Sequence, residues 1–340
     1  MTTKVINLVA DIGGTNIRIG YFINEGSNSQ AADVVNLQVF QCKQYDSLAD
    51  VLQTYLKQQE IESNTINACL AIACPVEDDL ISMTNLPWEF SQSDLKAQLK
   101  FNALYLINDY TAIAHAVPLL NEQQKVQVGT GLVVKEKPIA ICGPGTGLGV
   151  ANVVFSDGKC ISLGGEGGHV DFAPTDTTEI KILEFLLTKY QHVSYEQLLS
   201  GLGLEQIYQA VSHINGEKSE DLTAQQISEK ALSASCLTCE QALAQFCKVL
   251  GSFAGNLALT IASFGGVYIA GGIVPRFIQY LENSEFRARF EAKGRFNDFN
   301  RSIATFVITE PQPGILGASA FLSQQILKEQ PLYKNETVTL

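Results

Sequence analysis

Two glycine-rich segments of the chain have the composition of phosphate-binding turns. Residues 10–16 read Ala-Asp-Ile-Gly-Gly-Thr-Asn, and residues 143–149 read Gly-Pro-Gly-Thr-Gly-Leu-Gly. Glycines let a turn bring its backbone amides close to phosphate oxygens, and the threonine of each segment adds a hydroxyl donor. Neither segment is a Walker A motif, and both precede a predicted strand, whereas the dinucleotide fingerprint opens a helix. The pair predicts a nucleotide held by two halves of the chain, and an ordinary hairpin turn is the alternative for the first segment.

Acidic side chains follow two of the predicted strands. Asp11 ends the apolar run 5–10, where its carboxylate could hold a hydrated Mg²⁺ ion. Asn108 and Asp109 follow a strand predicted over residues 103–107 and should face the crevice at the carboxyl end of an α/β sheet. There Asp109 could accept a proton from a substrate hydroxyl. The alternative is that Asp109 is only the N-cap of a helix through His115.

Glu166 and His169 lie in a third glycine-rich segment, Gly-Gly-Glu-Gly-Gly-His-Val-Asp at residues 164–171. This segment has too little apolar mass to be part of a core. A zinc site would need further ligands that the sequence does not offer nearby. Hydrogen bonds to a polyhydroxylated ligand fit these residue types better. Glu196, taken alone, is typical of the first turn of a helix.

The elements that must position these residues are predicted twice in the same order. An apolar strand, a Gly-Thr turn, a returning strand and a third strand occur in each half of the chain, which predicts two similar α/β halves. The first half has predicted strands at 5–10, 17–22, 34–41, 67–74, 80–84 and 103–107 and helices at 46–59 and up to residue 100; the second has strands at 138–142, 150–155 and 160–163 and is mainly helical over 180–264.

Length and charge restrict the class of protein. At roughly 150 residues per domain, 340 residues predict two domains. The hydrophobic fraction of 46% is enough for large cores. The net charge of −12 disfavours nucleic acid and anionic membranes as partners. An anionic small ligand remains compatible with this charge if backbone amides and a metal ion hold it.

The cysteines and the apolar segments predict a cytoplasmic protein. Most of the eight cysteines lie in apolar runs, which is typical of reduced thiols, and the run 5–10 is too short for a signal peptide. Cys236 and Cys239 form one Cys-x-x-Cys, interpreted as structural thiols on a helix. Residues 249–275 are uncharged and long enough to span a bilayer, but two Gly-Gly pairs predict a buried helix and a short core strand instead.

Five motifs together resemble one known family. They are Ala-Asp-Ile-Gly-Gly-Thr-Asn, Ile-Asn-Asp-Tyr-Thr-Ala, Gly-Pro-Gly-Thr-Gly-Leu-Gly, Gly-Glu-Gly-Gly-His-Val-Asp-Phe-Ala-Pro and Ala-Gly-Gly-Ile-Val-Pro-Arg-Phe. In this order they resemble the bacterial ATP-dependent glucokinases of the hexokinase, or actin-like ATPase, superfamily, from about residue 5 to about 327. The zinc motif Cys-x-Cys-Gly-x-x-Gly-Cys of the related repressor, ORF and kinase group does not follow His169. Only ten residues precede Asp11, so we expect no DNA-binding domain there.

The resemblance implies a fold and a reaction. The fold would be a two-domain ribonuclease-H-like α/β fold with a cleft between the domains: a small domain of about 1–110 plus 313–330, and a large domain of about 111–312. The reaction would transfer the γ-phosphoryl group of ATP to the 6-hydroxyl of glucose, giving glucose 6-phosphate and ADP in the first step of glycolysis. A sugar-sensing binding protein and a chaperone-like ATPase on the same scaffold are the alternatives. A homodimer is also implied.

The resemblance also implies roles for individual residues. Asp109 would be the catalytic base. Glucose would be bound by Asn108, Asp109, Glu166, His169, Glu196 and, within Met-Thr-Asn-x-x-Trp, Asn85. ATP would be bound by Ala10, Asp11, Ile12, Gly13, Gly14, Thr15, Gly143, Gly145, Thr146, Gly147, Gly271 and Gly272, with the last two near adenosine. Mg²⁺ would be held by Asp11 through water.

Overall fold

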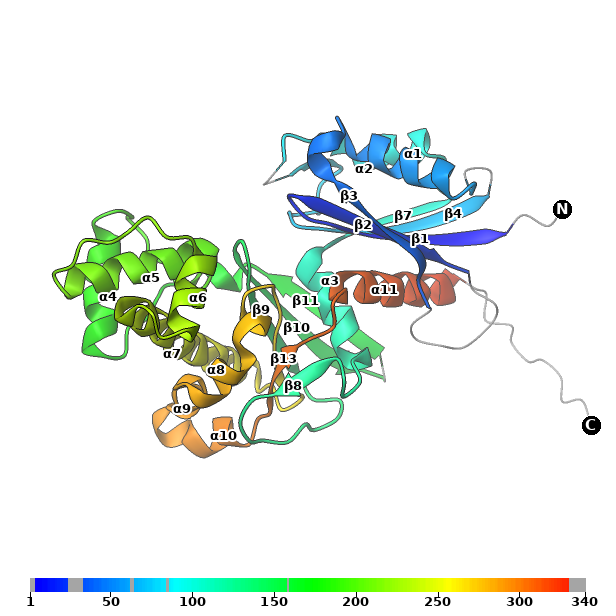
Figure 1. The fold of residues 1–340 in the computed structure, drawn as a ribbon. Coiled ribbons are helices and arrows are strands. Elements are labelled where there is room, and N and C mark those ends of the chain that lie inside the picture. Colours follow the sequence, from blue (N-terminus) through cyan, green and yellow to red (C-terminus); the bar gives the residue numbers. More distant parts are fainter. Residues whose placement is uncertain (1–3, 24–32, 62–63, 84–85, 158, 330–340) are drawn as a thin grey trace, which may run out of the picture. The chain divides into compact units, whose positions relative to one another are not determined.

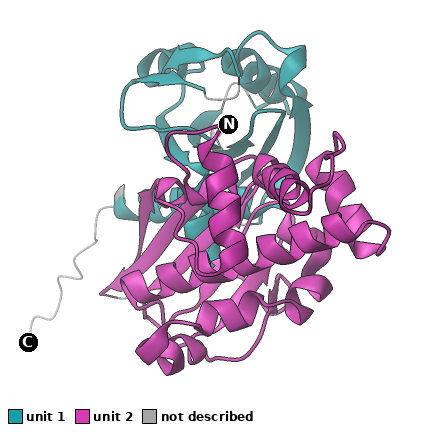
Figure 2. Ribbon diagram, turned by 90° about the vertical axis from the view of Figure 1, so that its left-hand side faces the viewer, with its two compact units in different colours: residues 1–119, 312–340 teal, residues 120–311 magenta. Residues whose placement is uncertain are grey.

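The structure, a computed structural model, describes residues 4–23, 33–61, 64–83, 86–157 and 159–329. The chain forms two compact units, coloured separately in Figure 2. Unit 1 comprises residues 1–119 and 312–340, and unit 2 comprises residues 120–311. Each unit is built on its own sheet (Figure 1).

The sheet of unit 1 has the strand order β3-β2-β1-β4-β7. A hairpin forms one side, because β1 pairs antiparallel with β2 and β2 pairs antiparallel with β3. The other side is parallel, with β4 beside β1 and β7 beside β4. The strands are β1 (Val5–Ile12), β2 (Asn16–Phe22), β3 (Val35–Gln41), β4 (Thr65–Ile72) and β7 (Ala103–Asn108); β5 (Leu80–Ser82) and β6 (Glu89–Ser91) form a separate pair.

Helices cover both faces of this sheet, and β1 is therefore buried on both sides. Leu8 and Ile12 belong to the core that includes residues of α1 and α2, whereas Val9 packs with Ile315 and Leu322 of α11. Serines cap the first two helices: the side chain of Ser47 accepts a hydrogen bond from the amide of the third residue of α1, and that of Ser91 does the same for α2. The helices are α1 (Leu48–Gln58), α2 (Gln92–Gln98), α3 (Asp109–Ala116), α11 (Pro313–Glu329) and the 3₁₀ turns η1 (Cys42–Gln44) and η2 (Val117–Leu119).

The sheet of unit 2 repeats this pattern, with the order β11-β10-β9-β12-β13-β8. Again a three-stranded antiparallel part, β9 to β11, continues into parallel strands, β12 and β13. This confirms the predicted repeat of strand, glycine turn and returning strand. The strands are β8 (Lys125–Gln127), β9 (Ile139–Pro144), β10 (Leu148–Ser156), β11 (Lys159–Gly165), β12 (Val267–Ile269) and β13 (Thr305–Ile308).

The helices of unit 2 surround α7 (Leu237–Ile261), the one described helix long and apolar enough to cross a membrane. Of its most apolar stretch, 72% is buried inside the protein, which is the burial of a core helix. It ends at Ile261 with Ala262, rather than a glycine, as its left-handed C-cap. Strand β12 follows between glycines, as the sequence predicts. The remaining helices are α4 (Thr177–Leu187), α5 (Gly201–Ile214), α6 (Ala224–Leu232), α8 (Ile278–Asn283), α9 (Phe286–Glu291), α10 (Asn297–Arg301) and the 3₁₀ turns η3 (Gly167–His169), η4 (Tyr195–Gln197), η5 (Val274–Phe277) and η6 (Gly294–Phe296).

The boundary between the units differs from the one predicted. A division after residue 110 would cut through α3, whereas the chain passes to unit 2 after Leu119. The reason is packing: Ala112 of α3 lies in the same core cluster as Ile315 and Ala318 of α11, so both helices stay with unit 1. Sequence patterns cannot show this contact, since α11 is almost 200 residues further along the chain.

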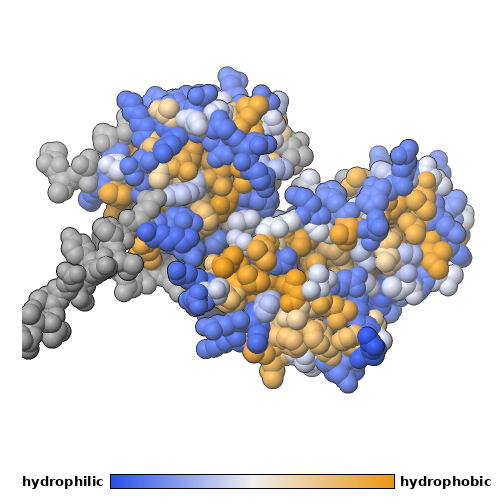
Figure 3. All heavy atoms as spheres, turned by 180° about the vertical axis from the view of Figure 1, so that it is seen from behind, coloured by the Kyte–Doolittle hydropathy of each residue, from blue (hydrophilic) through white to orange (hydrophobic). Residues whose placement is uncertain are grey.

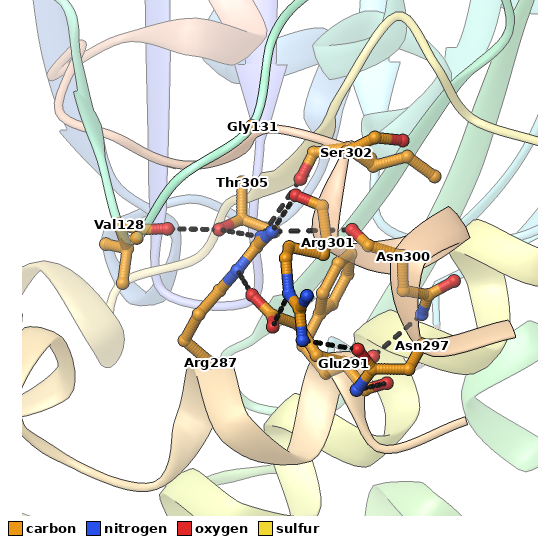
Figure 4. A network of polar contacts seen from close by, with 12 residues as sticks. Val128, Gly131, Arg287, Glu291, Asn297, Asn300, Arg301, Ser302 and Thr305 are labelled. Carbon is orange, nitrogen blue, oxygen red and sulfur yellow. Dashed lines mark hydrogen bonds and ion pairs between the residues drawn. The ribbon is translucent and has the colours of Figure 1, made fainter. Parts of the chain in front are cut away.

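Arg287 connects α9 with β13, the strand next to the edge strand β8 of the unit 2 sheet (Figure 4). From α9 its guanidinium donates to the carbonyls of Ile303 (3.0 Å) and Arg301 (2.9 Å) and to the hydroxyl of Thr305 in β13 (3.2 Å). Its Nε pairs with Glu291 at 2.7 Å. A planar fork with five donors can satisfy all these acceptors together, which a lysine cannot.

We predict that Arg287→Lys destabilises unit 2. Several buried acceptors would lose a charge-assisted hydrogen bond, so the free energy of unfolding should fall by about 2–4 kcal/mol. Arg301→Lys is the control, because Arg301 pairs with the same Glu291 but its side chain is 56% exposed, and exposed pairs contribute about 0–1 kcal/mol. Denaturant unfolding of both variants measures the difference, and equal midpoints for the two would contradict the prediction.

Candidate active site

The first phosphate-type turn joins β1 to β2 in unit 1. The amide of Gly13 donates to the carbonyl of Asn16 at 3.0 Å, and the amide of Cys42 donates to the carbonyl of Thr15 at 2.9 Å. Thr15 is exposed at the tip. The turn therefore has the geometry of a tight hairpin turn, which was the alternative interpretation, and this geometry is compatible with binding phosphate.

Asp11 lies just before this turn, beside a cation that sequence reasoning missed. Its carboxylate is 3.5 Å from the guanidinium of Arg18, its partner in the β1–β2 register. Burial raises the pKa of Asp11, and the charge of Arg18 opposes that shift. A Cβ at Gly314, the second residue of α11, would stand 2.9–3.2 Å from the carboxylate of Asp11, so this carboxylate also lies at a helix N-terminus. Arg18 could have been found from the sequence, because pairing β1 with β2 as a hairpin places residue 18 opposite residue 11.

Asn108 and Asp109 lie at the carboxyl end of β7, at the same end of the sheet as this turn. The parallel register aligns Ile12, Ile72 and Asn108 in one row across three strands, which spans roughly 10 Å at the usual strand spacing. Asp109 begins α3 and is half-buried. The interpretation of Asp109 as the helix cap is wrong. Asn108 fills that role, because its side-chain oxygen accepts from the amides of Tyr110 (2.9 Å) and Thr111 (3.4 Å).

A buried thiol lies near this carboxylate. Cys74 follows β4, the strand between β1 and β7, and is 4% exposed. Burial, followed by the negative charge of Asp109, raises the pKa of Cys74. Two carboxylates and one protonated thiol therefore lie together at the end of the unit 1 sheet formed by the carboxyl ends of β1, β4 and β7.

The second phosphate-type turn, in unit 2, is shorter than the sequence predicts. Strand β9 continues to Pro144 and β10 begins at Leu148, so the turn is Gly145, Thr146 and Gly147. Gly143 is buried within β9 and pairs with Gly149. The amide of Gly201, the first residue of α5, donates to the carbonyl of Gly145 at 2.9 Å. The N-terminus of a 14-residue helix thus lies against this turn, a feature that the sequence analysis missed.

Gly271 and Gly272 lie beside the same turn. The amide of Ala270 donates to the carbonyl of Cys142 at 2.8 Å, which brings the end of β12 next to β9. Gly271 has φ +85°, and a Cβ there would stand 2.3 Å from the carbonyl oxygen of Pro144. Only glycine allows this approach. A Cβ at Gly272 would meet nothing within 4 Å, so one side of this residue is open.

Glu196 joins the second turn to His169. Its Oε2 accepts from the amide of Leu148 at 2.8 Å, and its Oε1 is 3.9 Å from Nε2 of His169. This position requires glycine at 147, because a Cβ there would stand 2.5 Å from the carboxylate. Glu196 is 48 residues from Leu148 and 196 − 169 = 27 residues from His169 in the sequence, so neither contact could be predicted from spacing.

Glu166 precedes the 3₁₀ turn η3 and His169 is its last residue, and this turn packs against β10. The amide of His169 donates to the carbonyl of Glu166 at 3.0 Å, and both side chains are exposed. Within the described residues no cluster of three or more His, Cys, Asp and Glu could hold a metal ion, so the zinc alternative has no support there. Asn85, the remaining predicted ligand, lies outside the described residues.

A buried network positions the turn η4 that carries Glu196. The hydroxyl of Tyr195 accepts from the side-chain amide of Asn256 at 3.2 Å, and Asn256 in turn accepts from Nζ of Lys293 at 2.7 Å. The ring of Tyr195 packs between Phe172 and Phe253. Burial lowers the pKa of Lys293 to about 8 and raises the pKa of Tyr195. Glu196 therefore extends from a residue that is anchored in the core.

Known proteins match most of the chain. A family model described as Glucokinase matches residues 8–325. The glucokinase of Colwellia psychrerythraea is 58% identical, covering 95% of this chain and 97% of that protein. The crystal structure of a glucokinase from an Antarctic psychrotroph is 35% identical, with a TM-score of 0.85 over 94% of this chain and 99% of that chain.

More distant structures share the fold. A ROK-family glucokinase from Streptomyces griseus, solved with glucose and AMPPNP, is 15% identical with a TM-score of 0.62, over 94% of this chain and 99% of that one. At this identity the likeness concerns the fold alone. The α/β fold of the actin-like ATPases, predicted from the motifs, is thereby confirmed.

Proposed function

The chain belongs to the glucokinase family, and from this premise we propose how its own residues carry out the reaction. The enzyme transfers the γ-phosphoryl group of ATP to the 6-hydroxyl of glucose, giving glucose 6-phosphate and ADP, the first step of glycolysis. The observation that carries this conclusion is the 58% identity to a glucokinase over 95% of the chain. It favours the kinase over a sugar-sensing protein or a chaperone-like ATPase.

Asp109 is the proposed catalytic base. Phosphoryl transfer needs an in-line hydroxyl whose proton has an acceptor. The carboxylate of Asp109 is half-buried in the first turn of α3, where the helix dipole favours the ionised form that can accept a proton. Its Oδ1 is 2.9 Å from the amide of Tyr110, which fixes its orientation. Asn108 cannot act as a base, but its side-chain NH₂ is a donor for the sugar while its oxygen caps α3.

Six polar residues are proposed to bind glucose. Asn108 and Asp109 come from unit 1, and Glu166, His169 and Glu196 from unit 2, with Asn85 as a further candidate. Carboxylates accept hydrogen bonds from sugar hydroxyls, and imidazole can donate or accept. Glu196 shares its carboxylate with the amide of Leu148, so a change in the second turn reaches the sugar ligands directly.

ATP is proposed to contact both glycine turns. In unit 1 the candidates are Ala10, Ile12, Gly13, Gly14 and Thr15, with the cation Arg18 nearby. In unit 2 they are Gly145, Thr146 and Gly147, with the N-terminus of α5 as an added source of positive potential. Gly271 and Gly272 would lie near adenosine, and the open side of Gly272 leaves room for a ligand. Gly143 contributes through β9 rather than through the turn.

Mg²⁺ is the proposed cofactor, and the residues present fit it. This ion usually keeps several waters and is held by one or two carboxylates together with the phosphates of its nucleotide. Asp11 supplies one such carboxylate, 23% exposed, at the end of β1. When bound, Mg²⁺ would offset the charge of the phosphate oxygens. Arg18 would hold Asp11 in its ionised, oriented form.

A cytoplasmic homodimer is proposed on the family resemblance. Apolar side chains gather on the face seen in Figure 3, shown in orange, and exposed apolar patches are common at protein interfaces. Val35, Leu37 and Val39 are exposed along the edge strand β3, and Leu132 is 78% exposed in unit 2. The cysteines, all unpaired thiols, agree with a reducing compartment.

A coupled assay for ADP release tests the proposed function. We expect ADP release to depend on glucose and to be much slower with galactose or fructose, because a site that pairs each hydroxyl leaves buried groups unpaired with the wrong sugar. A rate of ATP hydrolysis that is the same with and without glucose would favour the chaperone-like ATPase. Binding of glucose without turnover would favour the sugar sensor.

We predict that Asp109→Asn lowers kcat roughly 10²–10⁴-fold, the usual contribution of a positioned base. The affinity for ATP should change little, and so should the unfolding midpoint, because Asn108 still caps α3. Asp94→Asn is a matched control, since Asp94 is an exposed carboxylate in the first turn of α2. Steady-state kinetics and denaturant unfolding on the same preparations measure both effects. Near-normal turnover in Asp109→Asn would refute its role as the base.

A further inference from the structure

Two thiols meet at the start of α7, outside every residue assigned to catalysis. Cys236 is the N-cap of this helix rather than part of it, and its sulfur accepts a hydrogen bond from the amide of Cys239 at 3.4 Å. Cys239 lies in the first turn. The interpretation of both as thiols on a helix is therefore incomplete, because the Cys-x-x-Cys spacing closes the first turn with one sulfur folded back on the other residue.

The two thiols differ in their access to solvent. Cys236 is partly exposed, and the next residue, Leu237, is 68% exposed. Cys239 is completely buried. All eight cysteines lie in the described part of the chain, and only Cys160 shares the partial exposure of Cys236. A reagent in solution can therefore reach Cys236 directly but can reach Cys239 only through it.

Cys236 lies at the positive end of a helix dipole. It caps the 25-residue helix α7, whose N-terminus attracts negatively charged groups. In the adjacent α6, a hydrogen bond to Glu220 is the main cause that raises the pKa of Lys230, and the charges of Cys239 and Cys236 act in the same direction. Glu220, 2.9 Å from Nζ of Lys230, partly balances this ammonium. In Figure 1, α6 and α7 lie side by side.

The surroundings of Cys239 favour its protonated form. Burial raises the pKa of Cys239 to about 12, and a hydrogen bond with Cys236 acts in the same direction. The two cysteine side chains therefore interact directly.

We propose that Cys236 and Cys239 form a site of reversible thiol–disulfide exchange with a low-molecular-weight disulfide such as glutathione disulfide. The Cys236 thiolate attacks one sulfur of glutathione disulfide, forming a mixed disulfide and releasing one glutathione thiolate. Cys239 then loses its proton to that thiolate or to water and attacks the sulfur of Cys236. The Cys236–Cys239 disulfide forms, the second glutathione leaves, and two protein thiols have been oxidised while one glutathione disulfide has been reduced to two thiols.

Mass spectrometry of the intact protein tests this site. The full-length protein is incubated with glutathione disulfide, and remaining thiols are blocked with N-ethylmaleimide. We expect the wild type to lose two hydrogen atoms and to retain no glutathione, with peptide mapping assigning the disulfide to residues 236 and 239. Cys239→Ser should instead accumulate a stable glutathione adduct on Cys236. Cys236→Ser should leave Cys239 unmodified, and serine is itself a good N-cap, so this variant should fold.

Matched variants separate this site from general thiol reactivity. Cys160→Ser should not change the reaction, and Cys160 itself should react at least tenfold more slowly than Cys236. Lys230→Met should slow the exchange several-fold, and Lys230→Arg should restore it. Phosphorylation of glucose by each variant at the wild-type rate shows that the protein is folded. A wild type that keeps a stable adduct on Cys236, stays fully reduced, or reacts as readily at Cys160 would overturn the proposal.

Discussion

The carboxylate of Glu196 reaches the second phosphate turn because residue 147 carries no side chain. A Cβ at this position would stand 2.5 Å from the carboxylate oxygen that accepts the amide of Leu148. The same carboxylate faces His169 across 3.9 Å. Tyr195, the residue before Glu196, is anchored in the core by Asn256 and Lys293, so the backbone of Glu196 is held in place. One side chain thus connects the proposed phosphate ligands to the proposed sugar ligands within unit 2.

In unit 1, the parallel direction of the strands brings the candidate residues together. Its parallel strands β1, β4 and β7 end in one row, so Asp11 and Asp109 come to the same end of the sheet. The two carboxylates are then differentiated by their neighbours. Asp11 is paired with Arg18, whereas Asp109 is held at the start of α3 beside Cys74. The first environment suits a group that holds a cation, and the second suits a group that accepts a proton.

Local patterns in the sequence predicted most of the strands, but not β6, β8 or β13. Short apolar runs predict β1, β9 and β12, because such runs can be buried on both faces of a sheet; the first run ends at Asp11, and the other two end at glycine. The chemistry at the strand ends could also be predicted, since Asp11 and Asn108–Asp109 follow apolar runs directly. The choice between Asn108 and Asp109 as the cap could not, because both residue types cap helices well. It is decided by where β7 ends.

Contacts between segments that are distant in the sequence could not be predicted from local patterns. Pairing of Gly143 with Gly149 lengthens β9 and shortens the second turn, and the packing of α3 on α11 moves the unit boundary. The bond from Leu148 to Glu196 and the approach of α5 to Gly145 are of the same kind. The family motifs implied roles for these residues but did not show which residues contact one another. The geometry adds the reason why glycine is needed at 147, which the motif alone does not explain.

The most direct test of this account is calorimetric titration of Gly147→Ala with glucose. The added methyl group meets only the flexible end of Glu196, so the variant should unfold at the wild-type midpoint. Its Kd for glucose should nevertheless rise roughly tenfold, the equivalent of about 1.4 kcal/mol for one charge-assisted hydrogen bond. Gly145→Ala, whose added Cβ would make only an ordinary contact at 3.9 Å, should bind glucose as the wild type does. An unchanged affinity for glucose in Gly147→Ala would contradict the claim that Glu196 couples the phosphate turn to the sugar site.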